Sequence, residues 1–216
     1  MMTAMTEAIR FTKSSVERYN AMIAALNSVN SNQLDGDIVE CGVWQGGNII
    51  LARAMCPDKI CWLYDTFEGM TRPDPVLDIK LSGKPVKAID RYDAKTVNGQ
   101  KWAAVSMEDV KKNFDSFGLM SDSHLKFVKG DVLNTLLEAT NIPEKVSLLR
   151  LDTDWYHSTR VELEVLYPKL VRNGILIIDD YGHWAGCKKA VDDYFKDKPV
   201  HSAQIDYTAI MIVKPC

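Results

Sequence analysis

Two adjacent carboxylates, Asp179 and Asp180, follow a run of four aliphatic residues from Ile175 to Ile178. A short apolar run that ends at turn residues is typical of a buried strand. Like charges at the end of such a strand repel each other and lose hydration, which costs free energy unless a cation or a hydrogen-bond donor compensates. The pair therefore indicates that a compensating group lies nearby.

Acidic residues follow four other apolar segments as well, at Glu40, at Asp65, at Asp131, and at Asp152 with Asp154. A solvated loop carboxylate is the ordinary explanation for any one of them, but it explains five acidic strand ends poorly. In doubly wound α/β sheets, ligands bind beyond the carboxyl ends of the strands, near the point where the strand order reverses. The sequence therefore predicts a ligand site lined by carboxylates at that edge.

Five apolar segments that alternate with helical patterns must position these acids. The predicted strands span residues 37–43, 60–67, 125–131, 146–154 and 173–180, and the predicted helices span 6–29, 44–55, 106–117, 132–140, 158–170 and 186–195. Residues 203–215 alternate in polarity, which predicts two short strands joined by a turn near Asp206. The predicted fold class is α/β, a doubly wound, mostly parallel sheet with a C-terminal antiparallel strand pair.

The chain is expected to form one domain over residues 1–216, with an N-terminal helical extension at 1–35. Residues 68–105 are rich in Pro, Gly, Asp and Lys and show little apolar periodicity. A long segment without regular structure inside a domain is usually functional or mobile. We expect this segment to be a lid loop near the ligand site.

Composition excludes some classes of protein. The net charge of -3 and the pI of about 5.8, without a long basic run, argue against a nucleic-acid partner. No apolar stretch is long enough to span a membrane, and no secretory leader pattern is present. The odd number of cysteines, five, fits reduced, buried thiols. These features predict a cytoplasmic protein.

The turn after the first predicted strand contains Gly42, Gly46 and Gly47, with Glu40 before them. This spacing is not the G-x-G-x-x-G fingerprint of dinucleotide-binding proteins, which argues against a nicotinamide dehydrogenase. An acid beside the turn suits an ammonium group better than a phosphate. Asp65, at the end of the second predicted strand, could accept both ribose hydroxyls of an adenosine-containing ligand, and Asp131 lies where it could meet the adenine edge.

These features resemble the class I S-adenosylmethionine-dependent methyltransferases, whose cofactor carries an amino acid end, a ribose and an adenine but no phosphate. Four segments, DIVECGVWQGG, YDTFEGM, LRLDTDWYHST and GILIIDDYGHWAGCKKAVDDYF, resemble in order the signature segments of the macrocin-type sugar O-methyltransferase family. The resemblance covers about residues 36–195. It implies a Rossmann-like methyltransferase fold and S-adenosylmethionine as the cofactor.

The resemblance also implies which residues hold the cofactor. The methionine end, the ribose and the adenine are expected to contact Thr12, Glu40, Gly42, Val43, Gly46, Asp65, Thr66, Phe67 and Asp131. Thr12 has an equally good explanation as a helix cap. Trp44 is a further candidate for the wall of the adenosine pocket.

Members of this family depend on a divalent metal, and the acids that match their metal site are Asp152, Asp179 and Asp180. Adjacent strand ends would bring these carboxylates together, and three oxygens with waters and substrate hydroxyls make an octahedral Mg2+ site. Asp154 is a competing ligand, because it lies on the same face as Asp152 if the strand extends that far.

The resemblance implies methyl transfer to a sugar hydroxyl, with Asp152 as the base. His157 and His183 are alternatives for this role, and surface or capping duty is the ordinary explanation for either histidine. The expected partner is a small-molecule sugar or diol acceptor, and the family tends to self-associate, which makes a homodimer or a larger homo-oligomer an expectation. Two other functions stay open, an O-methyltransferase of catechol-like or other vicinal diols and a cofactor-binding module without catalysis.

Overall fold

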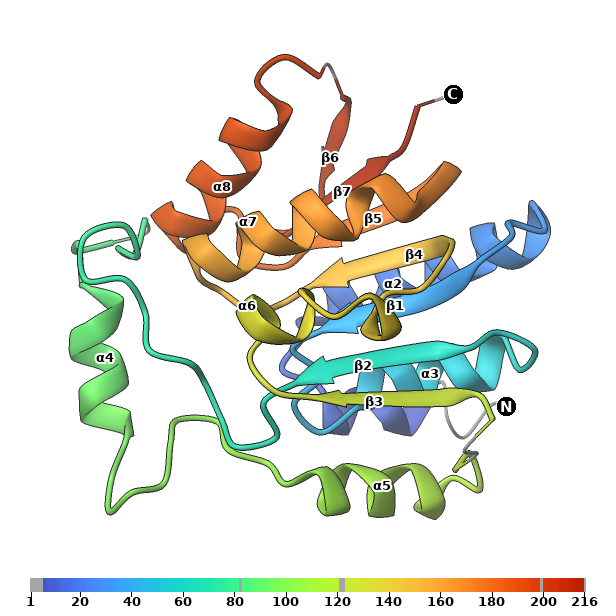
Figure 1. Cartoon of the computed structure of the whole chain (residues 1–216), viewed down its shortest axis with the longest axis horizontal. Helices are drawn as coiled ribbons and strands as arrows, with labels where there is room; N and C mark the ends of the chain where they lie inside the picture. Colours follow the sequence, from blue (N-terminus) through green and yellow to red (C-terminus); the bar gives the residue numbers. More distant parts are fainter. Residues whose placement is uncertain (1–5, 82, 121–122, 199, 216) are drawn as a thin grey trace.

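The computed structural model describes residues 6–81, 83–120, 123–198 and 200–215, and its centre is a seven-stranded sheet (Figure 1). The strand order is β3-β2-β1-β4-β5-β7-β6. Strands β1 to β5 are parallel to their neighbours, whereas β7 is antiparallel to both β5 and β6. The order reverses between β1 and β4. This arrangement confirms the predicted doubly wound α/β class with its C-terminal antiparallel pair.

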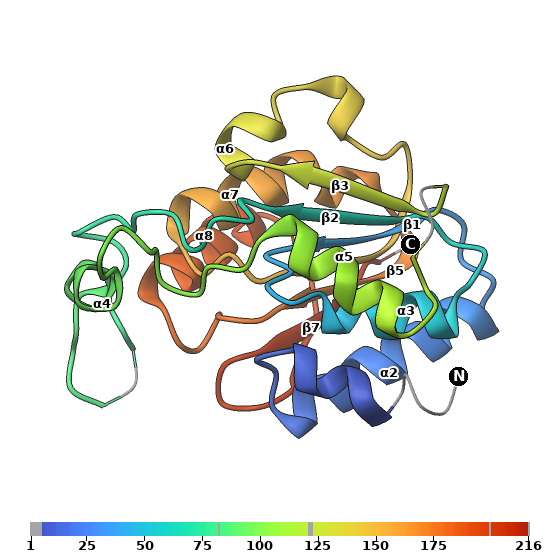
Figure 2. The ribbon, with the colours of Figure 1, turned by 90° about the horizontal axis from the view of Figure 1, so that it is seen from below.

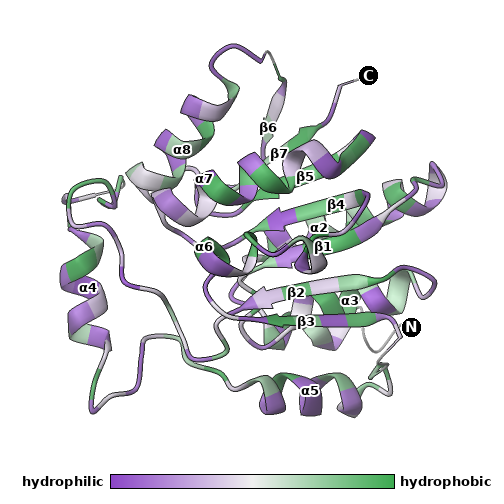
Figure 3. Ribbon diagram, viewed as in Figure 1, coloured by the Kyte–Doolittle hydropathy of each residue, from purple (hydrophilic) through white to green (hydrophobic). Residues whose placement is uncertain are grey.

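The strands are β1 (Asp37–Cys41), β2 (Cys61–Asp65), β3 (Leu125–Lys129), β4 (Val146–Leu151), β5 (Leu170–Ile178), β6 (Ser202–Gln204) and β7 (Ile210–Val213). All five predicted strands end two or three residues earlier than the sequence predicts, so that Asp152 and Asp154 lie in the loop after β4. Strand β5 begins three residues earlier than predicted, and its pairing with β4 contains a register shift. In Figure 3, the hydrophobic colouring of β1 and β4 gives way to hydrophilic colouring at their carboxyl ends.

Helices cover both faces of the sheet (Figure 2). One core lies between the sheet and α2 (Val16–Ser31), α3 (Gly47–Met55) and α5 (Met107–Ser116). The other lies against α6 (Val132–Thr135), α7 (Tyr156–Val165) and α8 (Ala185–Phe195). Successive residues of β4 serve opposite cores, since Leu148 belongs to the first and Leu149 to the second. The near-continuous apolar runs of the sequence follow from this burial on both faces.

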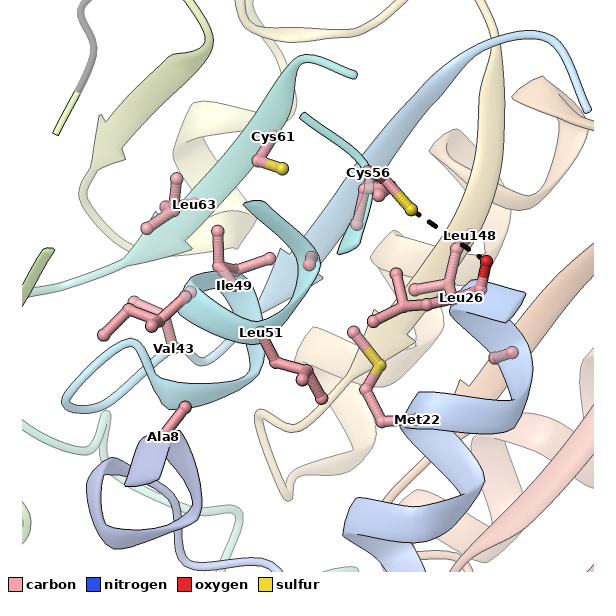
Figure 4. Packing of buried hydrophobic residues seen from close by; sticks show 14 of the residues in the cluster. Ala8, Met22, Leu26, Val43, Ile49, Leu51, Cys56, Cys61, Leu63 and Leu148 are labelled. Atoms are coloured by element: carbon pink, nitrogen blue, oxygen red, sulfur yellow. Dashed lines mark hydrogen bonds between the residues drawn. The ribbon is translucent and has the colours of Figure 1, made fainter. Parts of the chain in front are cut away.

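The N-terminal segment is not the single helix that the sequence predicts. A short 3-10 helix, η1 (Ala8–Phe11), is separated from α2 by an extended break, and Ser15 caps α2 by accepting a hydrogen bond from the backbone N–H of Arg18 at 3.1 Å. The η1 helix packs closely against Gly47, where a Cβ atom would lie 2.4 Å from the carbonyl oxygen of Ala8. Figure 4 shows η1 and α2 beside α3, with Leu51 of α3 pointing toward Met22 and Leu26 of α2 and with Ala8 at the start of α3.

The segment 68–105 contains one helix that the sequence analysis missed, α4 (Ala88–Lys95). Only Ala88 and Tyr92 are buried on it, so its apolar pattern is too short to recognise. The helix stands beyond the carboxyl ends of the strands in both ribbon views (Figures 1 and 2). A bridge between Lys80 and Trp184 ties the segment to the residues after β5.

The remaining short helices are η2 (Ala139–Asn141) and η3 (Tyr167–Lys169). Four cysteines, Cys41, Cys56, Cys61 and Cys187, are buried and not in disulfides, whereas Cys216 lies outside the described residues. Within the described ranges, no helix combines the length and the apolarity that a membrane crossing requires.

Candidate functional site

A cavity of about 280 Å3 opens at the carboxyl ends of β1, β2, β4 and β5, around the point where the strand order reverses. Doubly wound sheets bind their ligands at this position. The cavity brings together most of the residues that the sequence singled out: Thr12, Glu40, Gly42, Val43, Asp65, Thr66, Asp131, Asp152, Asp179, Asp180 and His183.

Two of the predicted cofactor residues do not line this cavity. The Gly46 backbone has a φ of 87°, and a Cβ there would lie 2.9 Å from the ring of Phe114, so this glycine permits packing of α5 against the turn. The Phe67 side chain is 4% exposed and packs with Phe127 at 5.9 Å between ring centroids. Both residues pack in the core beside the cavity, and neither lines it.

The turn after β1 is built for close backbone approach. Gly42 has a φ of 83°, and a Cβ atom there would lie only 2.1 Å from the carbonyl oxygen of Asp152, so no side chain fits. Asp65 holds the same turn, because its Oδ2 accepts the backbone N–H groups of Val43 at 2.9 Å and Trp44 at 3.1 Å. The carboxyl ends of β1, β2 and β4 are thereby fixed to one another.

The Asp65 carboxyl also accepts the backbone N–H of Phe67 at 2.8 Å through Oδ1. Burial raises its pKa, and the three backbone donors act in the opposite direction. Each oxygen of a carboxylate can accept more than one hydrogen bond, so Asp65 keeps acceptor capacity on the cavity side. Its predicted contact with a ribose stays compatible with this geometry.

Arg150, on β4, lies at the centre of a buried charge network. Its Nη1 is 2.7 Å from Glu40 Oε1 and 2.7 Å from Asp152 Oδ2, and its Nη2 pairs with Asp179. Arg150 is 2% exposed and Glu40 is 1% exposed. The positive charge of Arg150 therefore compensates part of the negative charge that the acidic strand ends bring into the protein interior.

Arg18, on α2, provides the second compensating charge. It pairs with the other oxygen of Asp179, and its Nε lies 3.0 Å from Asp206 Oδ2. Both oxygens of Asp179 are therefore occupied by guanidinium groups. The Asp206 carboxyl also accepts a hydrogen bond from the Ser15 hydroxyl at 2.8 Å, which links α2 to the β6–β7 turn.

Neither arginine was predicted from the sequence to be a site residue. Arg150 carried a usable signal, because a charged residue inside the apolar run VSLLRL must be buried and therefore needs acidic partners. Arg18 carried none, since an arginine on a surface helix is ordinary and its partners are distant in the chain.

Three carboxylates form a group with the spacing of a cation site: Asp152, Asp154 and Asp180 offer oxygens that all lie within 4.8 Å of one another. Asp179, which was expected in this group, is instead held by the two arginines, and Asp154 takes its place. The Asp180 Oδ2 atom is buried and has no hydrogen-bond partner. An orphaned buried carboxylate oxygen beside two other carboxylates fits a divalent cation.

Asp154 is held in an unusual backbone conformation, with a φ of 69°. Its Oδ2 accepts a hydrogen bond from the indole N–H of Trp184 at 2.9 Å. Burial is the largest cause that raises its pKa, and the nearby Asp179 charge adds to it. Burial likewise raises the pKa of Asp152 and Asp180. The three carboxylates repel one another, and a bound cation would relieve this repulsion.

The two candidate histidines lie in different places. His183 lines the cavity, and its Nδ1 is 3.2 Å from the hydroxyl of Tyr207. Its pKa is lowered, mainly by burial and further by nearby cations, so the neutral ring is favoured at pH 7. The His157 side chain is 51% exposed and lies 3.3 Å from Asp74, away from the cavity. A surface role explains His157.

Thr12 and Asp131 have local structural roles as well as a place in the cavity wall. The Thr12 hydroxyl donates to the carbonyl of Ile9 at 3.0 Å, which is the capping role that the sequence left open. Asp131 caps α6 by accepting the backbone N–H of Leu133 at 2.9 Å. Glu40 differs from both, because its Oε2 is buried and has no hydrogen-bond partner. A ligand ammonium group would satisfy that oxygen.

The chain matches the family model described as macrocin-O-methyltransferase (TylF) over residues 7–214. It is 34% identical over 184 residues to demethyldecarbamoylnovobiocin O-methyltransferase of Streptomyces niveus, which covers 83% of this chain and 65% of that protein. It is 33% identical over 192 residues to 8-demethyl-8-(2,3-dimethoxy-alpha-L-rhamnosyl)-tetracenomycin-C 4'-O-methyltransferase of Streptomyces olivaceus, over 87% of this chain and 68% of that protein. The chain thus spans about two thirds of the length of these curated relatives.

The fold is also similar to the solved structure of the O-methyltransferase NovP. The TM-score is 0.80 with 30% sequence identity, and the match covers 95% of this chain and 83% of that chain. The likeness therefore extends over nearly the whole chain.

Proposed function

Because the chain belongs to the macrocin-O-methyltransferase (TylF) family, we propose that it transfers a methyl group from S-adenosylmethionine to a sugar hydroxyl and needs a divalent cation to do so. The observation that carries this proposal is the Asp152–Asp154–Asp180 group, with its orphaned carboxylate oxygen, in the wall of the cavity at the β1–β4 switch point. The relative from Streptomyces olivaceus is named as a 4'-O-methyltransferase of a rhamnosyl-bearing tetracenomycin, which supports a sugar as the acceptor.

The cofactor would lie over the turn after β1. The unpartnered Oε2 of Glu40 is suited to the ammonium of the methionine end, and Gly42 and Val43 let the backbone approach it. Asp65 with Thr66 would accept the ribose hydroxyls, and Asp131 would contact the adenine. Thr12 would close the methionine end from the N-terminal segment. When bound, the cofactor supplies a methyl group on a sulfonium, which transfers to an oxygen placed in line behind it.

A divalent cation such as Mg2+ would be held by Asp152 and Asp180, with Asp154 as the third carboxylate in the arrangement observed. Asp179 could serve only if Arg18 and Arg150 released it. When bound, the cation would make the acceptor hydroxyl more acidic. The carboxylates also orient the acceptor, and such positioning is worth up to about 7–11 kcal/mol in the best intramolecular cases.

The hydroxyl proton must go to a basic group in the cavity, and Asp152 and His183 are our two candidates. His183 is favoured by its neutral ring and by Tyr207, which orients it. Burial raises the pKa of Asp152, whereas its ion pair with Arg150 acts in the opposite direction and occupies one of its oxygens. Replacing His183 with Asn should lower kcat and remove the low-pH limb of its pH profile if His183 accepts the proton, whereas an unchanged profile would leave Asp152.

The proposal is tested by methyl transfer from labelled S-adenosylmethionine to a panel of hexosides and catechols. We expect transfer to a hexoside, loss of activity in EDTA, and recovery with Mg2+ or Mn2+. The Asp180→Asn variant should lower Mn2+ affinity by roughly tenfold or more, because it removes a charged ligand, while S-adenosylhomocysteine affinity stays nearly unchanged. Full activity in EDTA would refute the metal requirement, and transfer to catechols alone would refute the sugar acceptor.

A further inference from the structure

Cationic side chains from two separate segments converge at the open side of the cavity. Lys13 comes from the break between η1 and α2, and Arg91 comes from α4; both line the cavity. Lys95, one turn further along α4, lines a second, open cavity of about 400 Å3. Trp102 and Ala103 line both cavities, so the second continues the first. We call Lys13, Arg91 and Lys95 the basic rim.

The basic rim takes no part in the ion pairs of the described residues. Among the described residues, no ion pair joins any of its three cations to a carboxylate, although the same region forms such pairs elsewhere: Arg72 lies 3.0 Å from Asp93, and Lys129 lies 3.0 Å from Glu68. The rim cations rest instead on indole rings. Arg91 and Lys95 lie 5.0 Å and 4.7 Å from the centre of Trp102, and Lys13 lies 4.7 Å from the centre of Trp44.

The rim charges also oppose one another. Burial lowers the pKa of Lys13 most, the charges of Asp154 and Asp152 raise it, and the smaller effects of the Lys95 and Arg91 charges lower it. Repulsion between Arg91, Lys95 and Lys13 does not stabilise the fold, and no described carboxylate lies within ion-pair distance of Arg91 or Lys95. An anion bound between them would relieve this repulsion, and the ring contacts hold the cations in place for it.

Aromatic side chains connect the rim to the acid group. Trp102 and Trp184 both line the cavity, and Trp155 lies between them, with ring centroids at 6.4 Å and 5.2 Å. Trp184 also donates to Asp154 at 2.9 Å. One wall of the cavity therefore runs from the proposed metal ligands to the rim. A sugar ring along this wall could present a hydroxyl to the acids and a charged substituent to the rim.

We propose that the acceptor is a nucleoside diphosphate sugar, whose diphosphate is bound by Arg91 and Lys95 with Lys13 at its edge. This inference rests on the proposed function, since it names the acceptor of the same reaction. A guanidinium offers paired donors that match a phosphate, and an ammonium adds a mobile charge. The open cavity beside Lys95 and Lys101 leaves room for the nucleoside. An uncharged glycoside would leave the rim unused.

The first part of the test measures binding. Calorimetry gives the affinity of the full chain, loaded with S-adenosylhomocysteine, for UDP and for dTDP. The Arg91→Gln/Lys95→Gln double variant should bind the better probe at least about tenfold more weakly, because charged hydrogen bonds are lost. The control is Arg72→Gln, which removes a cation of the same segment that Asp93 already neutralises; its affinity should not change. Circular dichroism and S-adenosylhomocysteine affinity show whether each variant is folded.

The kinetic arm compares a UDP- or dTDP-linked hexose with the methyl glycoside and the methyl uronate glycoside of the same sugar. We expect the nucleotide sugar to have the highest kcat/KM, and the double variant to lose this advantage by about tenfold through KM. Methyl transfer to the methyl glycoside with equal efficiency, or preference for the uronate, would overturn the inference and leave the proposed function intact. Binding of UDP or dTDP that depends on Arg91 and Lys95, without transfer to any sugar, would uphold the anion site and overturn the proposed function.

Discussion

The buried network around Arg150 makes a quantitative prediction about stability. Replacing Arg150 with Met keeps an apolar stem of similar length but removes the only cation that Glu40 contacts among the ion pairs of the described residues, and one of the two that hold Asp179. Glu40 is 1% exposed and Asp179 is 3% exposed, so water cannot replace the lost partner. Breaking a buried ion pair in this way costs about 3–5 kcal/mol. A domain of ordinary stability has about 5–15 kcal/mol in total.

The loss should depend on pH. Burial raises the pKa of Glu40 and Asp152 in the folded protein, and Arg150 is the strongest influence that lowers both. Without Arg150 their folded pKa values rise further above the unfolded ones. A carboxyl of this kind stabilises the fold fully below its unfolded pKa and loses that contribution as the pH rises through the folded pKa. The variant should therefore be closer to the original protein at pH 5.5 than at pH 8.

Urea unfolding in EDTA, followed by circular dichroism at both pH values, measures these differences. Arg172→Met is the matched control, because Arg172 is exposed at the start of β5, and it should change the free energy of unfolding by less than about 0.5 kcal/mol. A loss below about 1 kcal/mol for Arg150→Met at pH 8, or an equal loss at both pH values, would refute the reasoning about burial.

Two further substitutions test the turn after β1. Asp65→Ala should weaken S-adenosylhomocysteine binding in calorimetry, and it should also lower the free energy of unfolding by about 1–3 kcal/mol, because three backbone N–H groups lose their acceptor; unchanged affinity would show that the pocket lies elsewhere. Gly42→Ala should lower both stability and cofactor affinity, since its Cβ would meet the Asp152 carbonyl. A stable Gly42→Ala variant with full affinity would contradict the close packing of β1 against the β4 loop.

The fold was accessible from sequence because each buried strand is a short apolar run that ends in a turn. A short apolar segment such as Ile175–Ile178 is difficult to interpret as anything other than a buried strand. The alternation of strands with helices then limits the possible topologies. The strand ends were less certain, because polar residues after a strand can continue it or leave it. Asp152 and Asp154 illustrate this, since they lie in the loop after β4.

The position of the candidate site could be predicted from the sequence, but the cations that pair with its acidic residues could not. Carboxylates at strand ends must gather at one edge of a parallel sheet, and the cavity does collect Glu40, Asp65, Asp152 and Asp180. Which of the acids are neutralised by cations depends on tertiary contacts, and Arg18 lies 161 residues from Asp179. Helix α4, which carries Arg91 and Lys95 of the basic rim, was not predicted from the sequence, because only two of its residues are buried and its apolar pattern is too short.

The central claim is that the carboxylate group beside the cavity holds a divalent cation next to the cofactor. A crystal structure with S-adenosylhomocysteine and Mn2+, with an anomalous difference map at the manganese edge, tests it most directly. The account predicts one strong peak within bonding distance of Asp152 and Asp180, with Asp154 or Asp179 completing the set, and the cofactor product over Gly42. Cofactor product in the cavity with no anomalous peak at these carboxylates would contradict it.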